Sequence, residues 1–139
     1  ISWGWRNLSS RVRGQIFKAG HEKATRIELR SPDPACNPYL AFAVMLAAGM
    51  AGIENKYKLP EPIEENIFEM TPEQRTKKKI DALPDSLENA IRETEKSSLV
   101  KETLGNHIFT QLIANKKVEW DEYRIAVSNY EIDKYLPFL

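Results

Sequence analysis

Cysteine and histidine are scarce in this chain: 139 residues include a single cysteine, Cys36, and two histidines, His21 and His107. One cysteine excludes an internal disulfide framework and favours a reducing, intracellular setting. We expect Cys36 to be a small buried residue ahead of a helix rather than a nucleophile. The histidines lie far apart, and the sequence lacks a zinc-ligand spacing, a Ser/His/Asp arrangement and a glycine-rich phosphate loop. These absences disfavour a zinc site, a serine hydrolase and a P-loop nucleotide site.

Neither sign of charge is in excess, because 20 Lys and Arg residues balance 20 Asp and Glu residues. A chain without a basic block is not expected to bind nucleic acid as its main partner, since phosphate binding leaves a cationic footprint. The uncharged run at 39–53 is shorter than the roughly 18 residues that a membrane span needs. It is apolar on every side, which predicts a helix buried all round in a protein core. We therefore expect a cytoplasmic protein without nucleic-acid or membrane partners.

The strongest feature present is the segment 25–30, in which Arg26, Glu28 and Arg30 alternate with Ile27 and Leu29. This period of two predicts a strand with one apolar and one ionic face. Three charges on one face are costly to bury without partners. A site for an anionic substrate and a metal would supply such partners, and a ladder of salt bridges on a solvated strand would do so equally. The residues by themselves leave both interpretations open.

The order of the predicted elements indicates an α+β fold, with a few antiparallel strands at the N-terminal end followed by helices. Strands are expected within residues 1–30 and end at the prolines of 31–34. Asn37 and Pro38 predict the start of the buried helix, which should continue to about Asn55. The chain opens inside an expected strand, so we interpret it as part of a longer protein.

Further helices are predicted C-terminal to the buried one. A short charged helix should open at 71–73, and Asp85 with Glu88 predicts a capping box at the next. Leu87, Ala90, Ile91 and Thr94 would form its inward stripe. A break near 97–98 and a stop at Gly105 should precede a last long helix that runs toward Pro137. Its apolar positions recur at helical spacing: Ile108, Phe109, Leu112, Ile113, Trp120, Tyr123 and Val127.

Several motifs in one order resemble a known family. Residues 26–33 read RIELRSPD, and NPYLA follows at 37–41. Together with the segments 48–56, 64–68, 83–87 and 119–124, they resemble the C-terminal part of the catalytic domain of type I glutamine synthetase, in its non-adenylylated branch. The resemblance covers nearly the whole chain, so residues 1–139 are interpreted as the C-terminal portion of such a domain.

The resemblance implies an enzyme of nitrogen metabolism, a ligase that makes glutamine. It would join ammonia to L-glutamate with ATP, through a γ-glutamyl phosphate, and would need Mg²⁺ or Mn²⁺. The implied assembly is a cytoplasmic homo-oligomer, a two-ring dodecamer with active sites between subunits. Partners would then be glutamate, ammonia, ATP and further copies of the protein.

The resemblance also implies roles for individual residues. Glu28 matches a carboxylate that binds an active-site divalent metal. Arg30 matches the catalytic arginine that contacts glutamate and the transferring phosphate. Arg13 is implied to contact both substrate and ATP, Lys23 to contact ATP, and Arg26 to support the nucleotide phosphates. Because this set contains one metal carboxylate, we expect the isolated chain to be inactive.

One departure from the family pattern concerns the triplet Asn7-Leu8-Ser9, where the family has an arginine at the position of Leu8. Leucine cannot make a bidentate contact to carboxylate or phosphate. Arg11 is three residues along a presumed strand and would face the other way. Two alternatives to the ligase follow: a non-catalytic homologue that keeps the fold, and a ligase that uses another amine.

A second departure concerns regulation. In adenylylated members of the family the modified residue is a tyrosine in the segment that resembles 65–70, and here that position is Phe68. A phenyl ring has no hydroxyl to accept an AMP group. We therefore expect no adenylylation at this loop, and we expect Phe68 to pack the loop against its neighbour.

Overall fold

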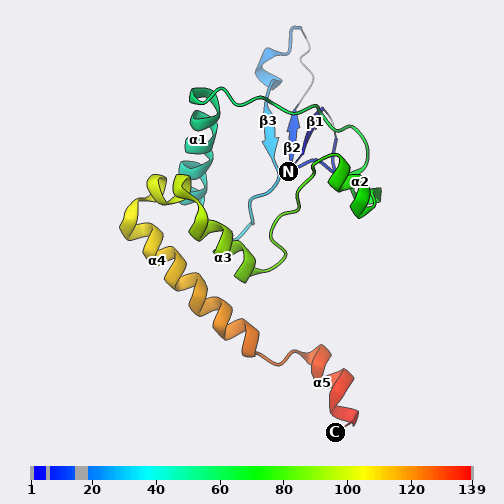
Figure 1. Ribbon diagram of the computed structural model, residues 1–139, viewed down its shortest axis with the longest axis vertical. Helices are drawn as coiled ribbons and strands as arrows, with labels where there is room; N and C mark the ends of the chain where they lie inside the picture. Colours follow the sequence, from blue (N-terminus) through cyan, green and yellow to red (C-terminus); the bar gives the residue numbers. More distant parts are fainter. Residues whose placement is uncertain (1, 6, 15–18, 139) are drawn as a thin grey trace. The chain divides into compact units, whose positions relative to one another are not determined.

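The computed structural model describes residues 2–5, 7–14 and 19–138, which divide into two compact units, Ile1–Leu83 and Pro84–Leu139. Unit 1 contains a small sheet and two α-helices, and unit 2 is helical (Figure 1). The predicted α+β class is confirmed. Across the described part of the chain, helices are either too short or too polar to cross a lipid bilayer.

The sheet of unit 1 has the strand order β1 (Trp3–Trp5), β2 (Val12–Gly14) and β3 (Ile27–Leu29) (Figure 1). β2 and β3 are antiparallel, as predicted, whereas β1 and β2 are parallel, so the prediction of antiparallel strands is wrong for that pair. Parallel neighbours ordinarily need a crossover of a dozen or more residues. Here only residues 6–11 separate β1 from β2 in the chain.

Alternation along the strands gives the sheet two chemically different faces. Gly4, Arg13 and Glu28 lie opposite one another across the three strands and define the ionic face. The other face is apolar and carries Trp5, Gly14 and Ile27 in register. The register of the strands confirms the prediction of a strand with one ionic and one apolar face.

Glycine is required at position 14 by the packing of the apolar face. A Cβ atom at Gly14 would lie 2.7 Å from the ring of Trp5. Trp5 also makes an edge contact with Trp3, with ring centroids 5.4 Å apart. These rings, with Leu59 and Pro60, border a pocket of about 450 Å³ on this face.

Helix α1 (Pro38–Glu54) begins and ends where the sequence predicts. The Asn37 side chain caps it by accepting hydrogen bonds from the backbone N–H groups of Tyr39 and Leu40, at 3.0 and 3.3 Å. The predicted burial is wrong: every residue of α1 keeps intermediate or full exposure, and Tyr39 is 83% exposed. A helix that is apolar all round needs neighbours on every side, and the described residues supply too few. Cys36 is likewise exposed rather than buried.

Unit 1 also contains η1 (Glu22–Ala24) between β2 and β3, and η2 (Ile67–Glu69) and α2 (Pro72–Lys77) after α1. Ile67 and Met70 are its buried apolar residues within the described range. The predicted start of α2 is confirmed, because the Thr71 hydroxyl accepts from the Gln74 N–H and the Gln74 side chain accepts from the Thr71 N–H.

Unit 2 is built on α3 (Leu87–Lys96) and α4 (Ser98–Ile125). The predicted inward stripe of α3 is confirmed, and its centre Ile91 is buried. The predicted cap is wrong by one residue: Ser86, not Asp85, accepts from the Asn89 N–H, at 3.2 Å. The buried apolar residues contributed by α4 are Leu104, Phe109 and Ile113.

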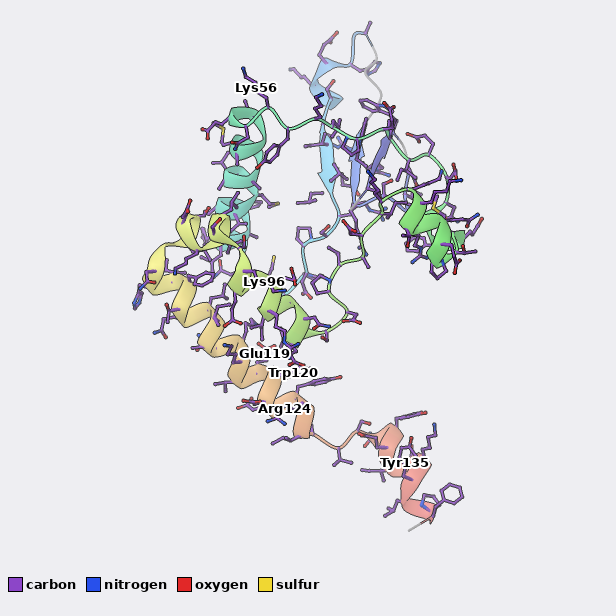
Figure 2. The ribbon with its side chains drawn as sticks, viewed as in Figure 1. Lys56, Lys96, Glu119, Trp120, Arg124 and Tyr135 are labelled. Carbon is purple, nitrogen blue, oxygen red and sulfur yellow. The ribbon has the colours of Figure 1, made fainter. Side chains whose placement is uncertain are left out.

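The predicted stop at Gly105 is a kink inside α4, where glycine takes φ +73°. The end of this helix was predicted too late, because α4 stops at Ile125, well before Pro137. A new helix, α5 (Asn129–Tyr135), follows, with η3 (Leu136–Phe138) after it. The C-terminal half of α4 projects Glu119, Trp120 and Arg124 from its surface (Figure 2).

Candidate functional site

The ionic face of the sheet holds a carboxylate between two guanidinium groups. Arg13 on β2 forms an ion pair with one carboxylate oxygen of Glu28 on β3. The Arg30 Nε lies 3.2 Å from the other oxygen of Glu28. The three side chains keep 25%, 38% and 36% of their surface exposed for Arg13, Glu28 and Arg30 respectively. The network is therefore half-buried and still open to a ligand.

Two features of the local backbone bring these groups together. Glu28 and Arg30 lie two residues apart along an extended segment and so share a face. The antiparallel register puts Arg13 directly opposite Glu28. A further hydrogen bond of 2.8 Å from the Arg30 N–H to the Arg11 carbonyl holds the register beyond β3. The alternation was visible in the sequence, whereas the register depended on which strands pair.

The charge balance of the network favours an anion. Two guanidinium groups face one carboxylate, so the network carries a net positive charge. The Nε atom of Arg13 is buried and lacks a hydrogen-bond partner among the described residues. Guanidinium groups bind carboxylate and phosphate through paired N–H donors.

The other two predicted nucleotide contacts precede Glu28 in the chain. Lys23 lies in η1 and is exposed, and Arg26 is exposed at the entry to β3. The structure thus joins Arg13, Glu28 and Arg30 in one network, and Lys23 and Arg26 lie before the strand that carries Glu28.

This network offers a divalent metal one protein ligand, the Glu28 carboxylate. Mg²⁺ takes about six oxygen ligands, several of which are waters or substrate oxygens. The part of the chain that the structure describes contains no group of three or more His, Cys, Asp or Glu side chains that could hold a metal. Glu28 fits the role of one carboxylate ligand, and the other ligands would be waters, substrate oxygens or residues beyond this network.

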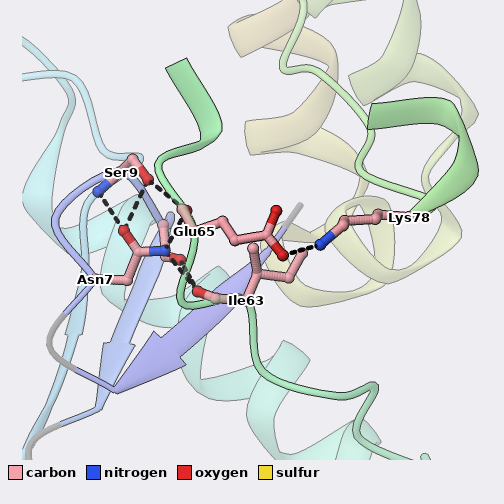
Figure 3. Close-up of polar contacts among 6 residues, drawn as sticks. Asn7, Ser9, Ile63, Glu65 and Lys78 are labelled. Carbon is pink, nitrogen blue, oxygen red and sulfur yellow. Dashed lines mark hydrogen bonds and ion pairs between the residues drawn. The ribbon is translucent and has the colours of Figure 1, made fainter. Parts of the chain in front are cut away.

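The turn at 7–10, which carries Leu8, is held by hydrogen bonds of Asn7 and Ser9 (Figure 3). Asn7 accepts from the N–H and hydroxyl of Ser9, at 2.9 and 2.7 Å. Its Nδ2 donates to the carbonyls of Ile63 and Glu65, at 2.5 and 3.0 Å. Leu8 is 63% exposed. The prediction that Arg11 faces away from Leu8 assumed a strand here and is wrong in its premise, because residues 8–10 form a turn.

Comparisons with known proteins give the family of the chain. The family described as "Glutamine synthetase, catalytic domain" matches residues 1–135. The chain belongs to this family. Membership confirms the resemblance on which the site residues were named, while the roles of those residues stay predictions.

Curated glutamine synthetases are similar along nearly the whole chain. The identity is 48% over 139 residues to that of Methanosarcina mazei, covering 100% of this chain and 30% of the relative. It is 46% to that of Thermus thermophilus, covering 98% and 30%, and 46% to that of Mycobacterium tuberculosis, covering 97% and 30%. The chain therefore spans about 30% of the length of the curated relatives it matches.

Two solved structures have a similar fold. One is described as a GmaS/ADP complex, with a TM-score of 0.77 and 28% identity. The match covers 98% of this chain and 29% of the chain in that structure. The other is described as apo GmaS without ligand, with a TM-score of 0.74 and 30% identity. That match covers 98% of this chain and 30% of the chain in that structure.

Proposed function

We propose that the whole protein is an ATP-dependent glutamate–ammonia ligase that makes glutamine through a γ-glutamyl phosphate. Residues 1–139 would be the C-terminal portion of its catalytic domain and would supply part of the active site. The observation that carries the proposal is the Arg13–Glu28–Arg30 network, a half-buried carboxylate flanked by two guanidinium groups. The identity of 46–48% to glutamine synthetases supports the same reaction.

The proposed catalysis separates the work of the three residues. Arg30 is proposed to bind the glutamate carboxylate and the transferring phosphate, where charge builds up on oxygen. Preorganised cations at such a position commonly contribute about 10²–10³-fold to turnover. Arg13 would orient the nucleotide phosphates and share the substrate. The metal, Mg²⁺ or Mn²⁺, would withdraw charge from the phosphate when bound, and Glu28 would supply one of its ligands.

The proposed nucleotide contacts extend from the network along the chain. Lys23 and Arg26 are exposed cations close in sequence to β3 and would contact nucleotide phosphates there. The structural relative described as a GmaS/ADP complex supports a nucleotide at this fold. Arg26 and Arg13 would meet phosphates through their planar donor sets, and Lys23 would act as a point charge.

The test is glutamine formation by the whole protein from glutamate, ammonia and ATP, read as ATP-dependent product with Mg²⁺ or Mn²⁺. We expect turnover that disappears without ATP or on chelation of the metal. The 139-residue chain assayed for γ-glutamyl transfer should stay at background, because its described residues offer one metal ligand in this network. Absence of turnover in the whole protein would contradict the proposal.

A non-catalytic homologue is the second candidate, and Leu8 is the observation that favours it. The side chain stands exposed on a fixed turn where the family pattern has an arginine, and it offers no donor to substrate. A third possibility is ligation of glutamate to another amine. Comparing ammonia with methylamine as substrates separates the three. Preference for ammonia supports the proposed ligase, preference for methylamine supports ligation to another amine, and use of neither supports the non-catalytic homologue.

We propose a cytoplasmic homo-oligomer for the whole protein, a dodecamer as the family resemblance implies. Exposed apolar side chains on α1, such as Tyr39, Phe42 and Leu46, agree with burial by further protein. Light scattering of the whole protein would give the mass. A monomer at micromolar concentration would contradict this assignment.

We propose that the loop containing Phe68 is not a site of adenylylation. Phe68 lies in η2 and is 75% exposed, so the expected packing of its ring against a neighbour is wrong within the described residues. Incubation with an adenylyltransferase and ATP should leave the intact mass unchanged. An added AMP in the peptide 56–70 would contradict the proposal.

A further inference from the structure

We propose that Asn7 is a positioning residue that fixes the turn at 7–10 and the segment at 63–67 beside Arg13. The inference rests on the proposed function, because it assigns these segments to the same active site. The asparagine clamp is defined as Asn7 and Ser9 with the backbone of Ile63, Glu65 and Ile67. Figure 3 shows Asn7, Ser9, Ile63 and Glu65 of this clamp.

The first argument is the complete use of the Asn7 amide. Its oxygen accepts two hydrogen bonds from Ser9, and its nitrogen donates two, to the carbonyls of Ile63 and Glu65. The residue is buried, at 9% exposure. An asparagine offers two donors and two acceptor positions, so this one is fully satisfied. Loss of either half would leave buried polar groups without partners.

The second argument is that the clamp joins segments distant in sequence. The bonds from Asn7 reach residues 56 and 58 positions away. Ser9 adds a bond of 2.9 Å as acceptor from the Ile67 N–H. The edge of β1 holds the same segment, through the Ile63 N–H to the Trp3 carbonyl at 2.8 Å and the Trp5 N–H to Glu64 Oε1 at 2.7 Å.

The third argument is the location of the clamp on the ionic face. A Cβ atom at Gly4 would lie 2.4 Å from the Ile63 carbonyl oxygen and 3.0 Å from the Asn7 Cβ. Gly4 is the register partner of Arg13, and Arg13 is that of Glu28. The clamp therefore stands one strand away from the network. Leu8, on the turn at 7–10, is exposed, and so is Phe68, which directly follows the segment at 63–67.

The consequence for function follows from preorganisation. A turn and strand edge held in one place keep the neighbouring Arg13 in position for substrate without an ordering cost. When a binding-competent arrangement is populated only in part, the apparent affinity falls by that fraction. Loosening the clamp should therefore weaken substrate binding more than it slows the chemical step. A general loss of folded enzyme would instead lower the apparent kcat and leave KM unchanged.

The test compares Asn7→Asp with Asn37→Asp in the whole protein. Asn7→Asp removes both donors and sets carboxylate oxygens against the carbonyls of Ile63 and Glu65. Asn37 uses its oxygen as an acceptor toward the N–H groups at the start of α1, so Asn37→Asp keeps the helix cap and controls for the added charge. We expect hydrogen exchange in peptides covering 63–69 to speed up at least tenfold in Asn7→Asp, and to be unchanged in Asn37→Asp.

The kinetic arm measures KM for glutamate and kcat in the same two variants. We expect KM to rise about tenfold in Asn7→Asp, with kcat within about twofold of the wild type. Unchanged exchange at 63–69 would overturn the clamp, and faster exchange with unchanged KM would overturn the positioning role. If the wild type has no turnover, the proposed function fails, and the exchange comparison still decides the clamp. Should Asn7→Asp not fold, Ser9→Ala removes the hydroxyl that accepts from the Ile67 N–H and donates to Asn7 Oδ1, and it should shift exchange in the same direction.

Discussion

Each of the two units of this chain is stabilised internally by a different kind of interaction. Unit 1 depends on hydrogen bonds between segments 56 to 59 residues apart, among them the Asn7 bonds to the 63–65 backbone and the Trp5 bond to Glu64. Unit 2 depends on apolar residues at helical spacing, such as Ile91 against the buried stripe of α4. Its surface adds local ion pairs within one helix, for example Arg92 with Glu88 at 2.5 Å.

This difference agrees with the proposed location of the active-site residues in unit 1. A helix pair needs only a repeating apolar stripe, and exposed ion pairs one turn apart add a few tenths of a kcal/mol each. A site needs polar groups held at fixed positions by groups from elsewhere in the chain. Unit 1 supplies these through the register of β2 with β3 and through the asparagine clamp.

The largest effect is expected at the centre of the ionic face. Glu28→Ala in the whole protein should reduce metal-dependent turnover to background, because the carboxylate is the metal ligand that the network offers. Glu122→Ala, at an exposed carboxylate of α4, is the matched control and should retain activity. Turnover near the wild-type level in Glu28→Ala would mean that the strand carries a ladder of salt bridges and no metal ligand.

The core of unit 2 should respond in stability rather than in chemistry. Phe109→Ala removes a buried ring and should lower the free energy of unfolding of this unit by about 3–5 kcal/mol. Its exposed neighbour Ile108 is the control, where Ile108→Ala should cost far less. Urea denaturation followed by circular dichroism measures both. Equal losses in the two variants would contradict the assigned inward face of α4.

A smaller effect is expected at the second guanidinium of the network. Arg30→Ala should reduce kcat about 10²-fold, the contribution typical of one preorganised donor. The fold should persist, because the side chain is partly exposed and its ion pair is a surface one. Arg92→Ala breaks a comparable ion pair in unit 2 and should leave kcat unchanged. Equal kinetics in the two variants would remove Arg30 from the mechanism.

Leu8 tests whether the exposed tip of the turn limits activity. Leu8→Arg should leave stability within about 0.5 kcal/mol, since the side chain is exposed. We expect turnover to rise, because the variant restores a donor where the family pattern has one. Leu8→Ala shortens the side chain without adding a charge and is the control. No rise in Leu8→Arg would mean that another residue fills the role.

The smallest effect concerns the N-terminus of α5. Hydrogen bonds from the Ser128 N–H and hydroxyl hold the pKa of Glu131 below its ordinary value. A lowered pKa means that the carboxylate stabilises the folded helix above its ordinary pKa, and this stabilisation is lost as pH falls through the lowered value. Amide exchange in α5 should therefore speed up, relative to Glu131→Gln, under acidic conditions. Parallel pH dependence in both proteins would contradict this assignment.

Much of the fold was determined by the sequence itself. The limits of α1, the cap at Asn37, the capping box of α2, the stripe of α3 and the kink at Gly105 all follow from local chemistry. Local signals act within a few residues and need no partner from elsewhere. The alternation at 26–30 likewise identified the strand and the face that carries Glu28.

The tertiary structure decided what local signals cannot encode. The parallel pairing of β1 with β2, the match of Arg13 to Glu28 and the bonds from Asn7 to the 63–65 backbone depend on which distant segments meet. The exposure of α1 has the same origin: an apolar sequence predicts that a helix needs neighbours, and only the packed structure determines whether the described residues supply them. Burial and register are properties of pairs of segments, so they become defined when the chain is folded.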